Sequence, residues 1–346
     1  MDDQYILTVI ISNYNQEKHI AETIDSVLAQ RVNFPFQIII TDDCSLRDRS
    51  RDVIRTYENK YDCIKAIYAS ENKGYLSNIL RAKERAKTKY LCLLDADDYW
   101  TDFDFLQRAY DFLENHNEYS IYEANVKVIS EIPGEENRHI EPCVSPKIHA
   151  GTYSKEMLIR NQEIPITQTT GMIFRNSIFI NGIPEILTNA VGTRSERSFE
   201  GDLGRFMMHL KEGLAYYDQR IVGVYRITED GLWSGQSEAK KIITNARSFL
   251  DYYQYYGTGI DFFVNKAYGL LQQYFTVKHN ELVHLEQEDE FIDEYERLRI
   301  EDVYRFCKEH ENEISITTQY SLAEKVMKRI RNIGRQKKKD QISKPG

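Results

Sequence analysis

The sequence lacks several features that mark whole classes of protein. Its five cysteines are scattered and form no CxxC pair, which argues against a disulfide framework and a thiolate zinc site. No apolar run reaches the roughly 18 to 20 residues needed to cross a bilayer. The first residues, MDDQYILTV, lack the basic start and apolar stretch of a signal peptide. We therefore expect a soluble globular protein in the reducing cytoplasm.

An excess of positive charge is also missing. The chain of 346 residues has 45 Lys and Arg against 54 Asp and Glu, which gives a net charge of −9. This balance argues against a general nucleic-acid binder, because such proteins need a basic surface. The length fits one large domain or two unequal ones.

Short apolar runs alternate with helical patterns over the first hundred residues. The runs YILTVIIS, FQIIIT and YLCLL, with Ile64 to Ala69, are typical of strands buried on both faces. Between them, apolar residues recur at helical spacing over residues 17–30, 49–61 and 77–87. This alternation predicts an α/β fold, with a Rossmann-like, mostly parallel sheet covered by helices on both faces.

The rest of the chain is less regular. From about residue 118 to 151 the pattern predicts loops, and residues 172–174 and 221–225 are candidates for further strands. After about Gly235 it predicts helices over 240–256, 264–277, 285–309 and 314–333. We expect one domain over residues 1–233 and a helical C-terminal region with a basic tail over residues 234–346.

Acidic residues follow the last of the predicted parallel strands. Ligands of such sheets bind outside the carboxyl ends of the strands. Asp95, Asp97 and Asp98 stand at that position, and because clustered carboxylates repel one another, they indicate a bound Mg²⁺ or Mn²⁺ ion. The alternative is a solvated acidic turn in which Asp98 caps the next helix.

Polar residues also follow the first two strands. Asp42 and Asp43 could accept hydrogen bonds from a base or a ribose, or they could begin a helix as an N-cap and an Asx turn. Asn13 and Tyr14 end the neighbouring strand, and the Tyr14 ring could stack on a base. Together these residues favour a nucleotide pocket.

Four blocks in this order, VIISNYNQEKHIAETIDSVLAQ, FQIIITDDCS, ENKGYLSN and YLCLLDADDYW, closely resemble the family 2 glycosyltransferases of the GT-A fold. The resemblance covers roughly the first 105 residues. It implies a nucleotide-sugar donor, a divalent cation, Mn²⁺ or Mg²⁺, at the acidic motif, and inversion at the anomeric carbon. Cell-surface polysaccharide or glycoprotein glycans are the implied products, and UDP is favoured over dTDP because the Asp43 position reads that base in the family.

The same resemblance assigns roles to single residues. Asp97 is implied as the metal ligand, with Asp98 as a second candidate beside Asp95, and Asp43 as the reader of a uracil-type base. Lys73 is a candidate for the cation facing the diphosphate, since Ser77 stands before Asn78 where many relatives have an arginine. The donor-nucleotide contacts implied are Ser12, Asn13, Tyr14, Asp42, Asp43, Lys73, Asn78, Asp95 and Ala96.

A second region, FEGDL followed by EGLAYYDQRIVGVYRITEDGLWSG, resembles the part of the family that holds the catalytic base. Asp202 matches the base and Glu200 is the reserve. Arg226 and Trp233 are candidates for donor or acceptor contacts, and Thr228 stands where many relatives have histidine.

The acceptor is the least defined partner. A glycan, lipid-linked or protein-linked hydroxyl is expected, and the sequence leaves open whether the chain forms a homo-oligomer. The tail, RQKKKD after an amphipathic pattern, either contacts an anionic membrane surface peripherally or is the solvated end of a packed helix. The rival functions are a sugar-phosphate nucleotidyltransferase, whose glycine-rich loop is missing here, and a catalytically degenerate binding partner of another transferase.

Overall fold

The computed structural model describes residues 4–134, 142–228, 231, 233, 235–257, 260–282 and 292–314. The chain forms two compact units, Met1–Gly235 and Gln236–Gly346. The predicted helix over 314–333 and the basic tail lie outside the described residues, apart from Ile314.

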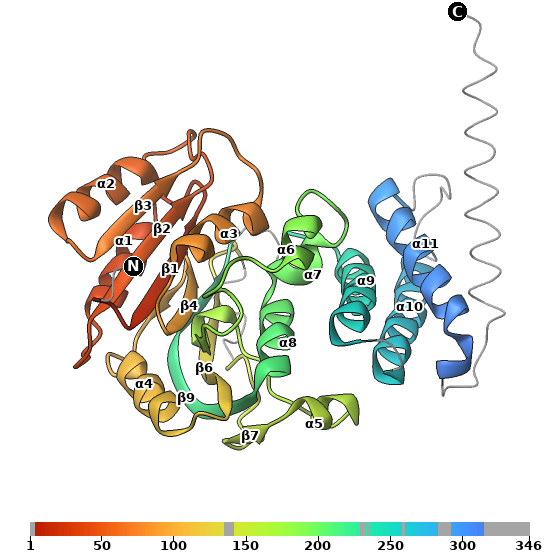
Figure 1. The fold of residues 1–346 in the computed structure, drawn as a ribbon. Helices are drawn as coiled ribbons and strands as arrows, with labels where there is room; N and C mark the ends of the chain where they lie inside the picture. The colour runs from red at the N-terminus through yellow and green to blue at the C-terminus, as the bar shows by residue number, and fades with distance from the viewer. Residues whose placement is uncertain are drawn as a thin grey trace, which may run out of the picture. The chain divides into compact units, whose positions relative to one another are not determined.

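The first unit is built on a nine-stranded sheet in the described part of the chain, with the order β3-β2-β1-β4-β8-β6-β9-β5 and with β7 paired to β9. Its first four strands are parallel, as predicted, and lie side by side in Figure 1. From β4 onward the sheet is mixed, since β8 runs antiparallel to both β4 and β6. The strands are β1 (Leu7–Asn13), β2 (Phe36–Asp42), β3 (Ile64–Tyr68), β4 (Tyr90–Asp95), β5 (Tyr99–Trp100), β6 (Tyr119–Ser130), β7 (Gly151–Tyr153), β8 (Met172–Arg175) and β9 (Leu214–Ile227).

Helices cover both faces of this sheet because strand side chains alternate between the faces. Val9, Ile11 and Ile38 belong to a buried cluster with apolar residues of α1, α2 and α4. Thr41 and Phe174 face the opposite way, toward Asn78 of α3 and the stacked ring of His209 of α8. The helices of this unit are α1 (Ile20–Leu28), α2 (Ser50–Lys60), α3 (Tyr75–Arg85), α4 (Phe105–Asn115), α5 (Lys155–Ile159), α6 (Glu185–Ala190), α7 (Glu196–Glu200) and α8 (Asp202–Glu212), with the 3₁₀ turn η1 (Thr169–Gly171).

One sequence prediction was wrong. Residues 119–130, predicted as part of a loop region, form β6, a strand in the middle of the sheet. The interpretation failed because Glu123 and Asn125, both polar, are nevertheless buried in this strand. Asn125 bonds to the backbone of Val144, whereas Oε1 of Glu123 has no hydrogen-bond partner among the described residues.

Burial raises the pKa of Glu123 to about 8. Between pH 4.5 and 8 the folded state therefore holds a proton that the unfolded state releases. As the pH rises through this range, Glu123 lowers the free energy of unfolding, by an amount on the order of 4 kcal/mol at pH 8.

We expect Glu123→Gln, which imitates the protonated acid, to raise the Tm at pH 8 and to leave it nearly unchanged at pH 5. Scanning calorimetry at both values, with exposed Glu118→Gln as control, checks this. An equal shift in Tm at both pH values would contradict it.

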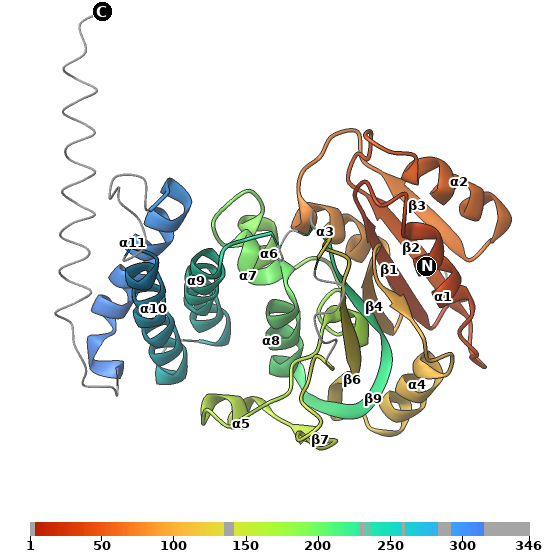
Figure 2. The same cartoon turned by 180° about the vertical axis from the view of Figure 1, so that it is seen from behind.

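The second unit is helical, as predicted. It contains α9 (Glu238–Tyr256), α10 (Asp261–Leu282), α11 (Glu294–Glu309) and the short turn η2 (Glu311–Glu313), and Figure 2 shows α9 and α10 side by side. Asp293 and Glu296 form a capping box at the start of α11, which satisfies backbone N–H groups there. Of the predicted helix over 285–309, the described residues form α11 from Glu294 onward, and residues 283–291 lie outside the described part.

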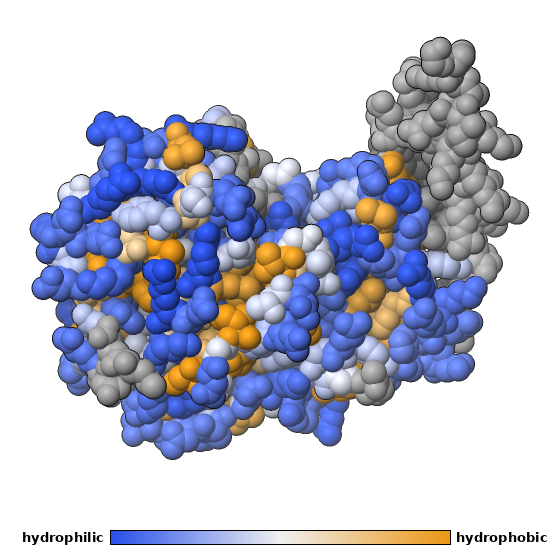
Figure 3. Space-filling view, turned by 45° about the horizontal axis from the view of Figure 1, so that its top comes forward, coloured by the Kyte–Doolittle hydropathy of each residue, from blue (hydrophilic) through white to orange (hydrophobic). Residues whose placement is uncertain are grey.

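The surface facing the viewer in Figure 3 is mainly hydrophilic, with hydrophobic residues in separate areas. No helix in the described part of the chain combines the length and the apolar character that a membrane span requires.

Candidate active site

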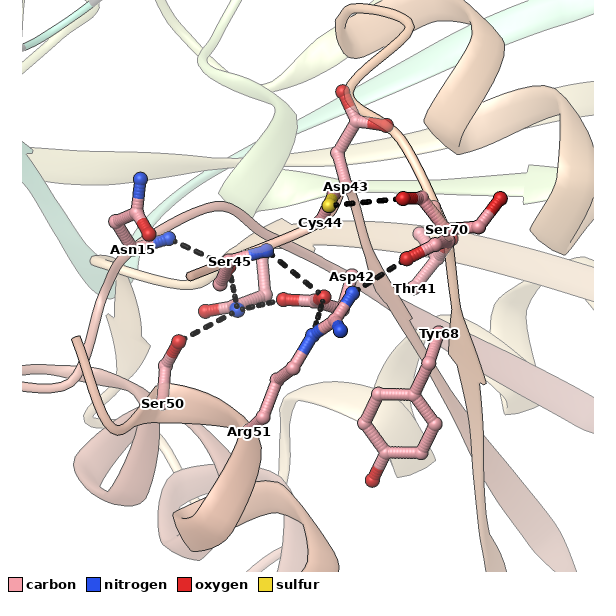
Figure 4. A network of polar contacts seen from close by, with 12 residues as sticks. Asn15, Thr41, Asp42, Asp43, Cys44, Ser45, Ser50, Arg51, Tyr68 and Ser70 are labelled. Carbon is pink, nitrogen blue, oxygen red and sulfur yellow. Dashed lines mark hydrogen bonds and ion pairs between the residues drawn. The ribbon is translucent and has the colours of Figure 1, made fainter. Parts of the chain in front are cut away.

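Asn13 and Asp42 end two neighbouring strands and are joined by a hydrogen bond. Asn13 Nδ2 donates to Asp42 Oδ1 at 2.7 Å, and Asp42 Oδ2 accepts from Ser45 N at 3.1 Å and from Arg51 Nε at 2.5 Å. Ser45 Oγ also accepts from the backbone N–H of Asn15 at 2.8 Å (Figure 4). Both predicted donor contacts are buried, and their side chains hold the loops after β1 and β2.

The Asp43 carboxylate accepts a second set of hydrogen bonds. Its Oδ1 accepts from Lys73 N at 3.1 Å and from Arg81 Nη2 at 2.8 Å, and its Oδ2 accepts from Gly74 N at 2.8 Å. Gly74 has a φ of +87°, which an L side chain adopts only with strain, so glycine suits this tight turn. The carboxylate therefore fixes the loop that precedes α3 over the end of β2.

The cation beside Asp43 is Arg81 and not Lys73. Lys73 Nζ lies 2.9 Å from Glu71 Oε1, and both side chains are more than half exposed. Arg81 also donates to Asn78 Oδ1 at 2.8 Å, one helical turn away. Sequence reasoning missed Arg81, although its i+3 spacing from Asn78 placed both on one face of a predicted helix.

Ser12, Asn78 and Tyr14 complete this edge of the sheet. Asn78 is buried and donates to Thr41 O at 2.9 Å and to Ser12 Oγ at 3.4 Å, which anchors α3 to β1 and β2. The Tyr14 ring is 40% exposed and follows β1 directly, so it is an aromatic group of this edge that a ligand can reach.

The acidic turn after β4 is held in place by its backbone. Ala96 N donates to Ser12 O at 3.0 Å, and Thr23 Oγ1 of α1 donates to Ala96 O at 2.8 Å and to Asp98 O at 2.7 Å. These bonds fix the backbone of the turn that carries the three carboxylates.

The three carboxylates have different surroundings. Asp95 Oδ1 accepts from Tyr75 Oη at 2.8 Å. Asp98 is buried, and its two oxygens accept from Arg226 N, at 2.9 Å, and from Thr170 Oγ1. No side chain of a described residue donates to the Asp97 carboxylate. Asp97 is thus the partly exposed member without a side-chain donor.

The three neighbouring carboxyl groups of this turn all have raised pKa values. Burial raises the pKa of Asp95, and burial together with the charge of Asp95 raises the pKa of Asp97 to about 7. Burial and the charges of Asp97 and Asp95 also raise the pKa of Asp98. Carboxylates in this condition gain stability from a cation, and hard oxygen donors suit Mg²⁺ or Mn²⁺. The described residues include no cluster of three His, Cys, Asp or Glu side chains arranged to hold a metal ion, so water and phosphate oxygens would have to complete the coordination.

Arg226 joins the acidic turn to two other elements. Its Nη1 donates to Asp97 O at 2.5 Å, and its Nη2 donates to Glu22 Oε2 of α1 at 2.6 Å. Its Nε lies 2.9 Å from Glu131 Oε1, and its guanidinium covers the Tyr99 ring at 4.4 Å. The side chain is buried, which places it in the framework of the turn, whereas Trp233 is 38% exposed.

Asp202 begins α8 and lies close to the acidic turn. Thr169 N donates to its Oδ1 at 2.8 Å, and Thr169 Oγ1 bonds to the same oxygen. The next residue, Thr170, holds Asp98, so two consecutive residues of η1 connect Asp202 with the acidic turn. No described residue donates to Asp202 Oδ2. The side chain of Glu200, the reserve base, lies outside what the structure describes.

The first unit thus brings Asp95, Asp97 and Asp202 into one electrostatic group, since the charge of Asp202 raises the pKa of Asp95. A partly exposed carboxylate with one oxygen to which no described residue donates can accept a proton, and the acidic turn beside it can hold a cation. Together they can serve a reaction in which one group loses a proton while another leaves with negative charge.

Comparison with known proteins identifies the family. Residues 8–182, just over half of the chain, match the family described as glycosyl transferase family 2. The putative teichuronic acid biosynthesis glycosyltransferase TuaG of Bacillus subtilis (strain 168) is 37% identical over 109 residues, which are 31% of this chain and 42% of TuaG. An uncharacterized protein of Mycobacterium tuberculosis (strain ATCC 25618 / H37Rv) is 34% identical over 126 residues, 36% of each chain. The matches thus span about a third of the first curated relatives.

Among solved structures, residues 1–349 of TarS from Staphylococcus aureus superpose with a TM-score of 0.58 at 17% identity, covering 88% of this chain and 82% of that one. The same TarS segment in complex with UDP-GlcNAc gives a TM-score of 0.50 at 18% identity, covering 89% and 92%. This likeness shows the fold, and it confirms the predicted GT-A arrangement with a helical C-terminal region. The chain belongs to glycosyl transferase family 2.

Proposed function

We propose that this enzyme transfers a sugar from a UDP-sugar to a hydroxyl group of a glycan, a lipid-linked or a protein-linked acceptor, with inversion at the anomeric carbon. The observation that carries the proposal is the η1 turn, in which Thr169 bonds to Asp202 and Thr170 bonds to Asp98. This pair keeps a candidate base next to a candidate cation site. The named activities of TuaG and TarS support the transferase class.

The reaction requires two charge changes. The bond between the anomeric carbon and the diphosphate oxygen breaks, a bond to the acceptor oxygen forms, and the acceptor loses its proton. Asp202 Oδ2 accepts that proton, while Thr169 holds Oδ1. The anomeric carbon passes through an oxocarbenium-like state, as in glycoside hydrolysis.

A divalent cation fits the acidic turn. Asp97 would bind it directly, because its carboxylate has no side-chain donor among the described residues, and Asp95 lies beside it. When bound, the ion stabilises the negative charge of the leaving diphosphate. We propose that Asp98 and Arg226 support this turn, because both side chains are buried and form hydrogen bonds to other elements.

The nucleotide would lie along the ends of β1 and β2. The exposed Tyr14 ring can stack on the base, and Asp43, held by Arg81 and the backbone of residues 73 and 74, is the acidic group next to it. UDP is proposed as the nucleotide from the family resemblance at Asp43, and the TarS complex with UDP-GlcNAc supports it. The location of all these groups supports the domain assignment, with catalysis in residues 1–233.

Calorimetry of the full chain tests the proposal. UDP-glucose, UDP-GlcNAc, dTDP-glucose and GDP-mannose are titrated with and without Mn²⁺. We expect a UDP-sugar to bind in the presence of Mn²⁺, with at least about a tenfold weaker Kd for the other nucleotides, since each tenfold step needs only about 1.4 kcal/mol of lost contacts. Slow release of UDP from the bound donor would support an enzyme. Binding without any turnover over the full panel would favour the degenerate partner instead.

A further inference from the structure

Arg205 is a buried arginine one turn after Asp202 on α8, and it has no role in the proton transfer or the cation binding proposed above. Its side chain is almost fully buried, with a relative exposure of 4%. Its Nε donates to Thr169 Oγ1 at 3.1 Å, and its Nη2 lies 3.4 Å from Asp202 Oδ1. Arg205 and Thr169 therefore act on the same oxygen of Asp202, and the other oxygen has no described donor.

The opposite side of Arg205 faces α3. The guanidinium carbon lies 5.8 Å from the centre of the Tyr75 ring, and Tyr75 Oη donates to Asp95 Oδ1 at 2.8 Å. The half-buried Tyr75 and the buried Arg205 thus form a bridge from Asp95 to Asp202. A second bridge, made by Thr169 and Thr170, reaches Asp98, and Arg205 joins the two bridges through its bond to Thr169 Oγ1.

Arg205 carries the fixed positive charge of this bridge. Burial alone would lower the pKa of Arg205, but the neighbours Tyr75, Asp202 and Asp95 together raise it. Two other bases are buried nearby, Lys83 and His209. Burial lowers the pKa of both, and the charge of Arg205 lowers it further. An arginine is well suited to this position between carboxylates, because its charge is delocalised and its planar guanidinium group can bond several oxygens at once.

We propose that Arg205 is a positioning residue for sugar transfer: its guanidinium, together with Thr169, fixes Oδ1 of Asp202 so that Oδ2 meets the acceptor hydroxyl. Through Tyr75, Arg205 also fixes the position of Asp202 relative to the acidic turn. The inference rests on the proposed function, because it needs Asp202 to be the base. Misplacement of a reacting group by about 1 Å can cost about 100-fold in rate, which sets the expected effect.

The test uses the full chain with Mn²⁺ and follows UDP release from UDP-GlcNAc and UDP-glucose, with water as acceptor. We expect Arg205→Met to lower kcat about 100-fold and Arg205→Lys about tenfold, with the Kd of UDP within about threefold of wild type. Lys83→Met is the matched control, since Lys83 is buried beside Arg205 and donates to neither carboxylate, and it should keep the wild-type kcat. Arg205→Ala should regain activity several-fold when guanidinium ions are added, whereas Lys83→Met should not respond.

Two outcomes would overturn the inference: a kcat of both Arg205→Lys and Arg205→Met within threefold of wild type, or an equal loss in Lys83→Met without guanidinium rescue. Arg205→Lys serves if the methionine variant does not fold. Asp202→Asn separates this inference from the proposed function. If Arg205 acts through Asp202, Arg205→Met costs nothing further in the Asp202→Asn background. Full activity of Asp202→Asn alone would instead refute the assignment of the base.

Discussion

Asp202→Asn is expected to reduce sugar transfer by about 10³-fold, within the range that positioned general bases contribute. Asparagine keeps the shape of the side chain, and its Oδ1 can still accept from the backbone N–H of Thr169. Its amide group, however, has no lone pair for the proton of the acceptor. We therefore expect the Kd of UDP with Mn²⁺ to stay within a few-fold of wild type while turnover is lost.

UDP release and calorimetry measure the two quantities separately. Glu212→Gln is a matched control, because it removes the same charge from an exposed position at the far end of α8. Retained turnover in Asp202→Asn would move the base elsewhere, first to Glu200.

Asp97→Asn and Asp98→Asn are expected to differ although the residues are adjacent. If Asp97 is the direct ligand, its loss should weaken Mn²⁺-dependent UDP binding at least about 100-fold, more than the loss of a supporting residue costs. Asp98→Asn should weaken it less than about tenfold, because its Oδ1 can still accept from Arg226 N and its amide can donate to Thr170, whose hydroxyl can reverse its role.

Calorimetry with UDP at several Mn²⁺ concentrations compares the two variants. Asp52→Asn, which changes an exposed carboxylate of α2, serves as the control for the loss of one charge. Equal losses in Asp97→Asn and Asp98→Asn would mean that both carboxylates bind the ion.

The central strands could be predicted from the sequence for a simple physical reason. β1, β2 and β4 are buried on both faces, so their residues form nearly continuous apolar runs. β6 is buried just as deeply, but Glu123 and Asn125 interrupt its apolar pattern. The sequence alone does not distinguish a buried glutamic acid, whose pKa is raised by burial, from an exposed glutamate.

The candidate site shows a similar division. The position of the carboxylates could be predicted from the strand ends, because the carboxyl ends of parallel strands lie at one edge of the sheet. The partner of each carboxylate was not predictable. Asp42 meets Arg51, and Asp43 meets Arg81, only after α2 and α3 pack on opposite faces of the sheet. Arg205 reaches Asp202 and Tyr75 from a helix that begins more than a hundred residues after the end of α3.

Arg226 has a consequence for the order in which the protein becomes functional during synthesis. Its contacts with Asp97, Asp98 and Glu22 span 129, 128 and 204 residues of sequence. The acidic turn is therefore translated long before the side chain that secures it. A nascent chain that has emerged only through residue 182, the end of the family match, contains the parallel strands β1 to β4 but neither Asp202 nor Arg226. The proposed cation site is thus completed late in synthesis, only when β9 joins the sheet.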